Sequence, residues 1–315
     1  MAALLLTGCS LEGALAPRGV SADIGNGLWW FMLWTGGAIT IGWLALFLVG
    51  LFRSHPDDDD PERERRLHRR FIVGGGVLLP AVTLGVLFVY DLVALNEIPD
   101  GGEITIDATG YQYWWEFRYD EPELVTANEL HIPVGTDVNV RLHTNDVIHS
   151  FWVPQLSGKR DMVPGKVNEL TLHAREPGRY LGECTEFCGI QHANMLFTVV
   201  AESAEDYQQW VQDQAQPAAQ PTTASQQRGY ETFMASSCAS CHVIAGTPAD
   251  GEVGPDLTHF ASRERLGAGV APNDRGHLGG WVVNAQNLKP GNEMPPVEIR
   301  GDRLSDLLDY LESLE

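Results

Sequence analysis

Two clusters of residues in the second half of the chain have side chains and spacings suited to metal chemistry. The first covers residues 184–195 and reads CTEFCGIQHANM, so two thiols, an imidazole and a thioether stand within twelve residues. An upstream segment, residues 146–154 with the sequence DVIHSFWVP, adds a second imidazole. Soft sulfur and imidazole ligands together select copper, zinc or iron–sulfur over hard cations, and a methionine favours copper.

The first cluster holds more sulfur than a single copper site uses. A blue-copper site takes one cysteine, two histidines and a weak axial methionine, whereas Cys184 and Cys188 are both available here. Two thiolates four positions apart, with His149 and His192, can bridge a pair of copper ions. A structural zinc site and a Cys184–Cys188 disulfide are the alternatives, but zinc sites favour closed Cys/His tetrahedra with CxxC spacing.

The second cluster, CASCH at residues 238–242, has the spacing of covalent haem attachment. In CxxCH the two cysteines, Cys238 and Cys241, form thioethers to haem c, and His242 is the proximal iron ligand. We expect the sixth ligand to be Met294, in the segment KPGNEMPP, because Met234 precedes the haem motif. His259 and His277 are rival ligands, and we expect both to be solvated surface residues.

The first cluster resembles the dinuclear copper A site of cytochrome oxidase subunit II, and the resemblance covers about residues 24–200. It implies a cupredoxin-like β-sandwich in which two cysteines bridge two copper ions. The implied copper ligands are Cys184, Cys188, His149, His192, Met195 and the backbone carbonyl of Glu186. The same resemblance implies a magnesium ion at the interface with subunit I, held by the Glu186 side chain and, through water, by Asp161; a carboxylate with several waters suits magnesium.

The last ninety residues, about 226–315, resemble class I cytochrome c domains. A short amphipathic helix leads into the haem motif, and leucines recur at helical spacing near the C-terminus, at Leu304, Leu307, Leu308, Leu311 and Leu314. This resemblance implies an all-α domain. The whole chain then resembles subunit II of a bacterial caa-type oxidase, in which the cytochrome c domain is fused after the copper domain.

Two positions depart from the family pattern. The tryptophan through which family members receive electrons corresponds here to Tyr113, beside Trp114, so these aromatics are candidate entry residues; a strand that packs its aromatics in the core is the alternative. Many members also carry a glutamate at the start of the second membrane helix that feeds a proton channel. Here that neighbourhood reads RRFIV at residues 69–73 and has no acid.

The N-terminal third contains two uncharged runs, residues 28–52 and 71–90. At about 1.5 Å per residue each is long enough to cross a bilayer core of about 30 Å. We expect membrane helices at about 28–52 and 71–95, within a segment 24–98. The loop between them is rich in arginine, and the excess of basic residues in short loops places such a loop in the cytoplasm. The copper and haem domains would then lie on the outer face of a bacterial inner membrane.

The chain begins with an apolar segment, residues 1–23, in which LTGC at 6–9 resembles a lipobox. Cys9 is therefore a candidate for acylation, although the basic region of a signal peptide is missing. A chance apolar terminus is the alternative. The five cysteines do not form a simple disulfide framework, because each has a separate chemical role in this interpretation.

Short β-forming runs separated by turn residues occupy residues 99–212 and predict a β-sandwich. Residues 213–227, DQAQPAAQPTTASQQ, lack large apolar side chains, so we expect a flexible linker before the haem domain at 228–315. The formal net charge of −21 argues against nucleic acid as a partner and favours solubility or a basic protein partner.

These expectations combine into one function: the electron-entry subunit of a proton-pumping terminal oxidase. Electrons would come from cytochrome c or another reduced donor protein, pass through haem c and the copper pair, and reach subunit I, where O2 is reduced to water; subunit III would be a further partner. The alternatives are a membrane-anchored copper storage or delivery protein and a copper-free quinol oxidase subunit. A nitrous oxide reductase would need a large propeller domain that this chain lacks.

Overall fold

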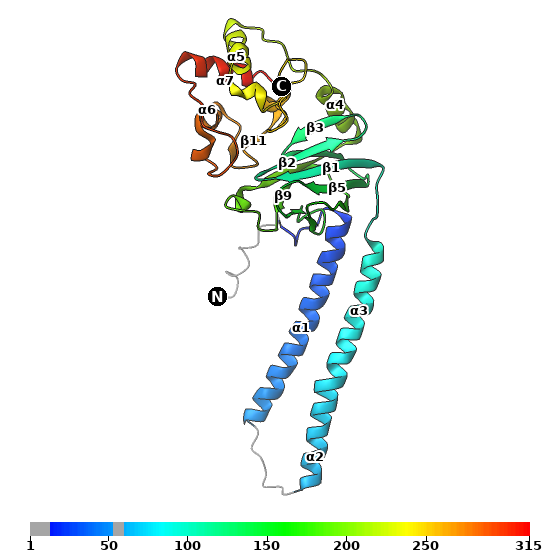
Figure 1. Cartoon of the computed structure of the whole chain (residues 1–315). Helices are drawn as coiled ribbons and strands as arrows, with labels where there is room; N and C mark the ends of the chain where they lie inside the picture. The colour runs from blue at the N-terminus through cyan, green and yellow to red at the C-terminus, as the bar shows by residue number, and fades with distance from the viewer. Residues whose placement is uncertain (1–12, 53–59) are drawn as a thin grey trace, which may run out of the picture. The chain divides into compact units, whose positions relative to one another are not determined.

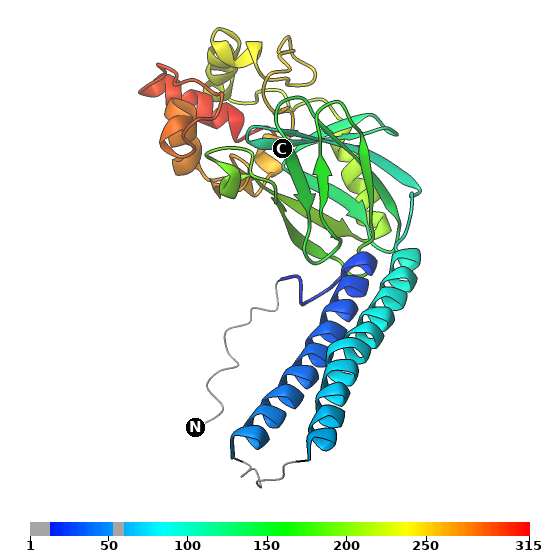
Figure 2. The ribbon, with the colours of Figure 1, turned by 60° about the horizontal axis from the view of Figure 1, so that its bottom comes forward.

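The computed structural model describes residues 13–52 and 60–315, so the candidate lipidation site Cys9 lies outside the described residues. The chain divides into two compact units. One is an N-terminal helical unit, Asp23–Pro99, and the other contains Asp100–Glu315 together with residues 13–22. Figures 1 and 2 show the helices, the β-sandwich and the C-terminal helical domain.

Among the described residues, two helices are long and apolar enough to cross a membrane: α1 (Val20–Phe52), and a continuous helix Pro61–Glu97. The second contains α2 (Pro61–Arg70), a π-helical stretch η1 (Phe71–Leu78) and α3 (Leu79–Glu97). The rings of Phe31 and Tyr90 stack with their centroids 5.2 Å apart and join the two helices. Both predicted runs therefore lie within helices.

The second helix begins ten residues before its predicted start, within the segment expected to be a charged loop. The Asp60 side chain accepts hydrogen bonds from the backbone N–H groups of Glu62 and Arg63 and so caps the helix. Pro61 suits the first helical position, and oppositely charged side chains four residues apart face one another along this turn. Local charge chemistry thus extends the helix beyond its apolar part.

The copper domain predicted from sequence is a sandwich of two five-stranded sheets. The first sheet has the order β3 (Leu124–Ala127), β2 (Trp114–Tyr119), β1 (Ile104–Tyr111), β5 (Val138–Thr144), β8 (Asn168–Leu172). The second has the order β4 (Glu129–Pro133), β10 (Leu196–Glu202), β9 (Gly178–Cys184), β6 (His149–Trp152), β7 (Arg160–Met162). The pairs β1–β5 and β4–β10 are parallel, and the other paired strands are antiparallel.

The core of the sandwich is aromatic. Alternate residues of β2 point inward, and Trp115, Phe117, Phe151 and Phe197 are completely or almost completely buried and pack ring against ring. A following helix, α4 (Ala204–Gln214), brings the ring of Trp210 into a stack on His131 with centroids 4.2 Å apart. This packing fixes the sheet ends from which the metal-binding loops project.

The C-terminal domain is mainly helical, as expected, and is built from α5 (Ala224–Met234), α6 (Arg275–Asn284) and α7 (Asp302–Leu311). Short 3-10 turns η3 (Ser237–Ser240), η4 (Phe260–Ser262) and η5 (Ala285–Asn287) and a two-residue ladder of β11 (Arg265–Leu266) with β12 (Ala271–Pro272) complete it; η2 (His192–Asn194) belongs to the sandwich. Leu307, Leu308, Leu311 and Leu314 are buried, as their helical spacing predicts.

The segment before α5 differs from the flexible tether that its composition predicts. Its ends are helical, in α4 and α5, so only residues 215–223 connect the two helices. Ala218 is buried and donates its N–H to the carbonyl of Ala245 at 3.0 Å, and the Gln216 carbonyl accepts from the His259 ring at 3.0 Å. The connection therefore lies against the haem domain because backbone hydrogen bonds compensate for its lack of large apolar side chains.

Helices α5 and α7 approach most closely at Gly229. A Cβ built there would lie 2.1 Å from the backbone carbonyl oxygen of Asp306. We predict that Gly229→Ala destabilises the haem domain by about 1–3 kcal/mol, because the helices must separate to admit a methyl group. Thermal unfolding followed by haem absorbance measures this as a lower Tm.

Gly280→Ala is the control. That glycine is an exposed helical residue with nothing within 4 Å, so alanine should stabilise the domain by about 0.5–1 kcal/mol. Equal effects of the two changes would contradict the close-packing argument.

Candidate metal and haem sites

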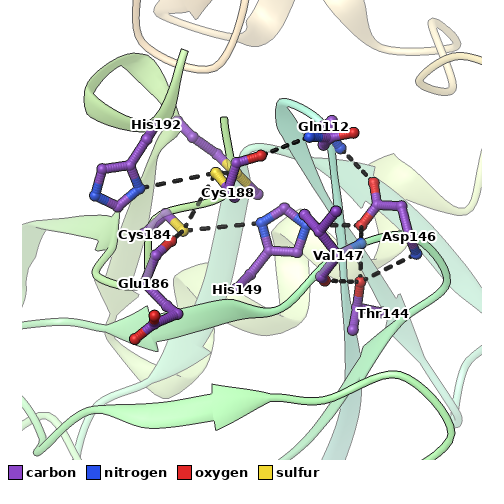
Figure 3. Close-up of polar contacts among 10 residues, drawn as sticks. Gln112, Thr144, Asp146, Val147, His149, Cys184, Glu186, Cys188 and His192 are labelled. Carbon is purple, nitrogen blue, oxygen red and sulfur yellow. Dashed lines mark hydrogen bonds and ion pairs between the residues drawn. The ribbon is translucent and has the colours of Figure 1, made fainter. Parts of the chain in front are cut away.

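The predicted copper ligands come from two neighbouring strands and the loop that follows one of them. His149 begins β6, Cys184 ends β9, and Cys188, His192 and Met195 lie on the loop between β9 and β10. Strands β6 and β9 pair with each other, so Phe151 lies opposite Cys184. Figure 3 shows the histidine and cysteine side chains of this group directed toward one another.

The sulfur and nitrogen atoms form a continuous series of contacts. The Sγ atoms of Cys184 and Cys188 are 3.8 Å apart; His149 Nδ1 is 3.8 Å from Cys184 Sγ, and His192 Nδ1 is 3.8 Å from Cys188 Sγ. Met195 Sδ lies 3.8 Å from Cys188 Sγ, and the Glu186 carbonyl oxygen lies 3.2 Å from Cys184 Sγ. The potential ligand atoms of His149, Cys184 and Cys188 all lie within 4.8 Å of one another, a spacing that could hold a metal ion. The structure thus brings together all six groups that the sequence predicted.

The two neighbouring thiols shift each other's pKa in opposite directions. The Cys188 thiol lies beside Cys184 and, despite the opposing effect of burial, lowers the pKa of Cys184 to about 3. The same interaction, together with burial, raises the pKa of Cys188. Burial acts to lower the pKa of His149, but the Cys184 sulfur and the Asp146 carboxylate beside the ring raise it. A soft cation could replace these protons, because it would neutralise both sulfurs at once.

Asp146 orients His149. Its Oδ1 lies 2.8 Å from His149 Nε2, which leaves Nδ1 directed toward the sulfurs. The carboxylate also accepts hydrogen bonds from the Thr144 hydroxyl and from the backbone N–H groups of Gln112 and Val147. A ligand histidine commonly donates its second ring nitrogen to such a carboxylate. Two aromatic residues follow on the same strand: Phe151 is a fully buried core residue, and Trp152 is half-buried.

The two predicted magnesium residues lie on neighbouring segments. Asp161 in β7 is exposed and accepts a hydrogen bond from the Ser150 hydroxyl at 2.8 Å. Ser150 in turn accepts, through its carbonyl, the backbone N–H of Thr185, which directly precedes Glu186. The Glu186 side chain is exposed. Both carboxylates are therefore open to a hard cation or to another protein surface.

The haem motif faces a pocket. Cys241, His242 and Met294 line it together with apolar residues that include Val253, Leu257, Phe260 and Trp281. His242 Nδ1 lies 2.7 Å from the carbonyl of Pro255, which it can reach as a donor, so Nε2 is left for a metal. A Cβ at Gly254 would lie 2.5 Å from His242 Cε1, so glycine is needed for this close approach. An apolar pocket lined by an imidazole, a thioether and the Cys241 thiol fits haem c, and Cys238 is partly buried against the core of the same domain.

The alternative iron ligands lie elsewhere. Met234 is partly buried and packs against the haem-domain core. His277 is about half exposed and pairs with Asp274, as expected of a surface residue. The expectation for His259 was wrong: it is buried, with its ring nitrogens 2.9 Å from the Glu315 carbonyl and 3.0 Å from the Gln216 carbonyl. These two carbonyls occupy the nitrogens that iron would need.

The copper domain supplies part of the haem pocket. Gln112, Tyr113, Trp114 and Asn128 line the pocket from the sandwich side. Tyr113 is buried, with its hydroxyl close to the backbone of Gly189 on the copper-ligand loop. Trp114 is half-buried and stacks on Tyr111 with centroids 4.7 Å apart. Tyr113 thus lies between the pocket and the copper-ligand loop, whereas Trp114 lines the pocket.

Two residues that join the copper-ligand loop to its surroundings, Gln112 and Lys289, were not predicted from the sequence. Gln112 donates from its side-chain amide to the Cys188 carbonyl at 2.5 Å, and so joins the pocket wall to the copper-ligand loop. Lys289 is almost completely buried in contact with both domains. Burial lowers the pKa of Lys289 to about 7, and the nearby Cys188 sulfur acts in the opposite direction. Hydrogen bonds to three carbonyls also suit the charged form of the group. Neither Gln112 nor Lys289 belongs to a motif with a characteristic spacing. The one available sign in the sequence was the position of Lys289 within the predicted methionine loop.

Sequence comparisons agree with this geometry. The profile described as "Cytochrome C oxidase subunit II, periplasmic domain" matches residues 120–203, and the profile described as "Cytochrome c" matches residues 226–315. Cytochrome c oxidase subunit 2 of Alkalihalophilus pseudofirmus is 33% identical, over 99% of this chain and 94% of the relative. The same subunit of Bacillus sp. strain PS3 is 27% identical, over 100% of this chain and 95% of the relative.

Among solved structures, the periplasmic domain of subunit II of cytochrome oxidase of Bradyrhizobium japonicum is similar at 29% identity. The match covers 37% of this chain and 96% of that domain, with a TM-score of 0.36.

A β-sandwich with a buried sulfur–imidazole cluster, joined to a cytochrome c domain and preceded by two apolar helices, defines a membrane-anchored electron-transfer protein of a respiratory oxidase. The chain belongs to the cytochrome c oxidase subunit 2 family. It is therefore a subunit of a cytochrome c oxidase, and its outer domains are periplasmic.

One histidine and two glutamates in the sandwich form an ion-pair network with a pH-dependent effect. His131 lies 3.0 Å from Glu202 and 3.9 Å from Glu129. Burial acts to lower the pKa of His131, but the two carboxylates raise it above the ordinary value of 6.5. This stabilisation is fully present below about pH 6.5 and is lost as the pH rises through the raised pKa.

We predict that the free energy of unfolding of the full chain in detergent, measured by denaturant titration, falls as the pH rises across this range. The fall should be at most about 1.4 kcal/mol per pH unit, and His131→Gln should flatten the dependence. An unchanged slope in the variant would show that another group is responsible.

Proposed function

We propose that this chain receives electrons at a haem c in its C-terminal domain and passes them through a dinuclear copper centre to subunit I, where O2 is reduced to water. The observation that carries the proposal is the pair of buried Cys184 and Cys188 sulfurs, 3.8 Å apart and each 3.8 Å from a different histidine. A copper-free quinol oxidase subunit would have no use for this ligand set. A copper storage or delivery protein would have no use for the haem pocket.

Each group in the cluster has a definable part in the proposed copper centre. Cys184 and Cys188 would bridge two copper ions, His149 and His192 would bind through Nδ1, and Met195 and the Glu186 carbonyl would be weak ligands. When bound, such a pair supplies a one-electron carrier whose shared sulfurs keep geometric change small.

The surrounding chain holds those ligands in place. Asp146 fixes the ring of His149, and the Trp115 indole N–H donates to the Met195 carbonyl at 3.4 Å. Orientation of ligands by such neighbours typically changes metal affinity by about 10–100-fold.

In the haem domain, Cys238 and Cys241 would form the thioethers, His242 would be the proximal ligand and Met294 the distal one. The Pro255 carbonyl beside His242 Nδ1 strengthens the donor character of Nε2. Tyr113 and Trp114, in the pocket wall, are the proposed route toward the copper loop.

Further assignments follow from the family resemblance. The exposed carboxylates of Glu186 and Asp161 would hold magnesium at the interface with subunit I. The complex would also contain subunit III, translocate protons and receive electrons from cytochrome c or another reduced donor. Proton uptake would start at a residue other than the usual acid, because residues 69–73 contain none. We propose the bacterial inner membrane as the location and Cys9 as a lipidation site.

Metal analysis and EPR of the intact oxidase complex test the copper proposal. We expect two coppers in this subunit and a hyperfine pattern from one electron shared by two copper nuclei. Cys188→Ser should abolish the shared pattern, because one bridging sulfur is lost. Cys241→Ser is the matched control: it should disturb haem attachment and leave the copper signal intact. A wild-type chain that held zinc, or exchangeable Cu(I) without the shared pattern, would refute the proposal.

The haem proposal is tested by the two methionines beyond the linker. Met294→Leu should lower the reduction potential of haem c and open the iron to added ligands, because methionine ligation raises the potential. Met234→Leu makes the same chemical change at a residue packed in the core and should leave the potential and spectrum as they are. Redox titration and visible absorption measure both. Equal shifts in the two variants would rule out Met294 as the ligand.

A further inference from the structure

Lys289 is a buried cation that contacts three separate backbone segments. Only 2% of its surface is exposed. Its Nζ donates hydrogen bonds of 2.7 Å to the carbonyls of Tyr113, Asn194 and Gly267. An ammonium group has three N–H donors, so the three carbonyls use its whole capacity. Two of these acceptors belong to the copper domain, and the third belongs to the haem domain.

The contact joins the two loops that carry predicted cofactor ligands. Lys289 stands five residues before Met294, and its acceptor Asn194 immediately precedes Met195 on the copper-ligand loop. A second bond runs the opposite way, from the Gln191 amide to the Pro290 carbonyl at 3.0 Å. Gly291 also lies directly against the Ile190 side chain. The methionine loop of the haem domain therefore rests on the copper-ligand loop.

Two backbone N–H groups elsewhere in the contact also find their acceptors across it. The Leu196 N–H donates to the Ala268 carbonyl at 3.0 Å, and the Glu264 N–H donates to the Glu129 carboxylate at 3.1 Å. At the edge, Arg179 pairs with Glu264 at 3.0 Å, where both side chains are substantially exposed. A buried charge thus lies at the centre of the contact and an exposed ion pair at its rim.

This arrangement decides which bond should matter most. Exposed ion pairs contribute little, because water competes for both partners. Removal of a buried charged donor leaves its acceptors without a partner inside the protein, and that loss is not recovered from solvent. Lys289 is therefore the residue whose removal should separate the domains.

We propose that Lys289 is a positioning residue that docks the cytochrome c domain on the copper domain and so fixes the haem pocket against the copper-ligand loop. The inference deepens the proposed function, but only its consequence for electron transfer rests on that function. The docking itself depends on the hydrogen bonds described above and is measurable whatever metal the cluster holds.

Amide hydrogen exchange in the full-length, haem-loaded chain tests the docking. The Leu196 and Glu264 amides report separation of the domains, because their acceptors lie across the contact. The amides of Val199 in β10 and Leu308 in α7 report unfolding of each domain by itself. In Lys289→Met we expect Leu196 and Glu264 to exchange at least about tenfold faster, with Val199 and Leu308 unchanged.

Arg179→Ala is the control at the rim of the same contact, and it should change Leu196 exchange by no more than a few fold. Lys289→Gln keeps an N–H donor without the charge, so its exchange should lie between wild type and Lys289→Met. Either of two results would overturn the proposal: unchanged exchange at Leu196 and Glu264 in both Lys289 variants, or equal acceleration at Leu308. The second would mean that Lys289 stabilises only the haem domain through Gly267.

Discussion

The metal site proposed in the outer unit depends on two buried sulfurs that lie 3.8 Å apart. Cys184 and Cys188 cannot both be thiolates at that distance unless a cation lies between them, because like charges in a buried site repel strongly. Without a cation, one sulfur keeps its proton: the pKa of Cys184 is lowered and that of Cys188 is raised. A site in this condition accepts metal by releasing protons. The features around it act to keep the two sulfurs in that position.

The backbone carbonyls of the copper-ligand loop are held from several sides. The Met195 carbonyl accepts from the Cys184 N–H and from the Trp115 indole, and the Cys188 carbonyl accepts from Gln112. Trp115 in turn is completely buried among the aromatic rings of the sandwich. Cys184 and Trp115 lie on strands and Gln112 lies in the tight turn between β1 and β2, so the sheets hold the loop in place. Small geometric change at a redox site requires this kind of support.

The ligands could be predicted from the sequence because their chemistry is local. CTEFCGIQHANM and CASCH carry their meaning in residue type and spacing, and the structure brings the first set together as expected. The apolar runs and the leucines of α7 were also readable, since burial repeats with a helical period. The strand carrying His149 was not predicted: all but the last of its four residues are buried, so it lacks alternation. Lys289 and Gln112 could not be found either, because their roles come from residues 76–176 positions away in the chain.

His259 and the connecting segment show a related limit. A histidine and a Gln/Ala/Pro-rich stretch each indicate solvent exposure when taken alone. Together they are complementary, because the histidine ring reaches the Gln216 carbonyl and the segment is held against the domain. Composition describes what a segment can do without partners, and here the partner is the domain that follows it.

Docking changes what the covalent fusion achieves. A flexible tether alone would give the haem domain an effective concentration of about mM near the copper domain, with no preferred orientation. A contact that includes a buried lysine selects one orientation, with Tyr113 and Gln112 forming a wall of the haem pocket. In that orientation the candidate entry residues Tyr113 and Trp114 face the chain's own haem domain. A soluble donor would then have to deliver its electron to haem c, and the specificity for that donor would reside on the surface of the haem domain.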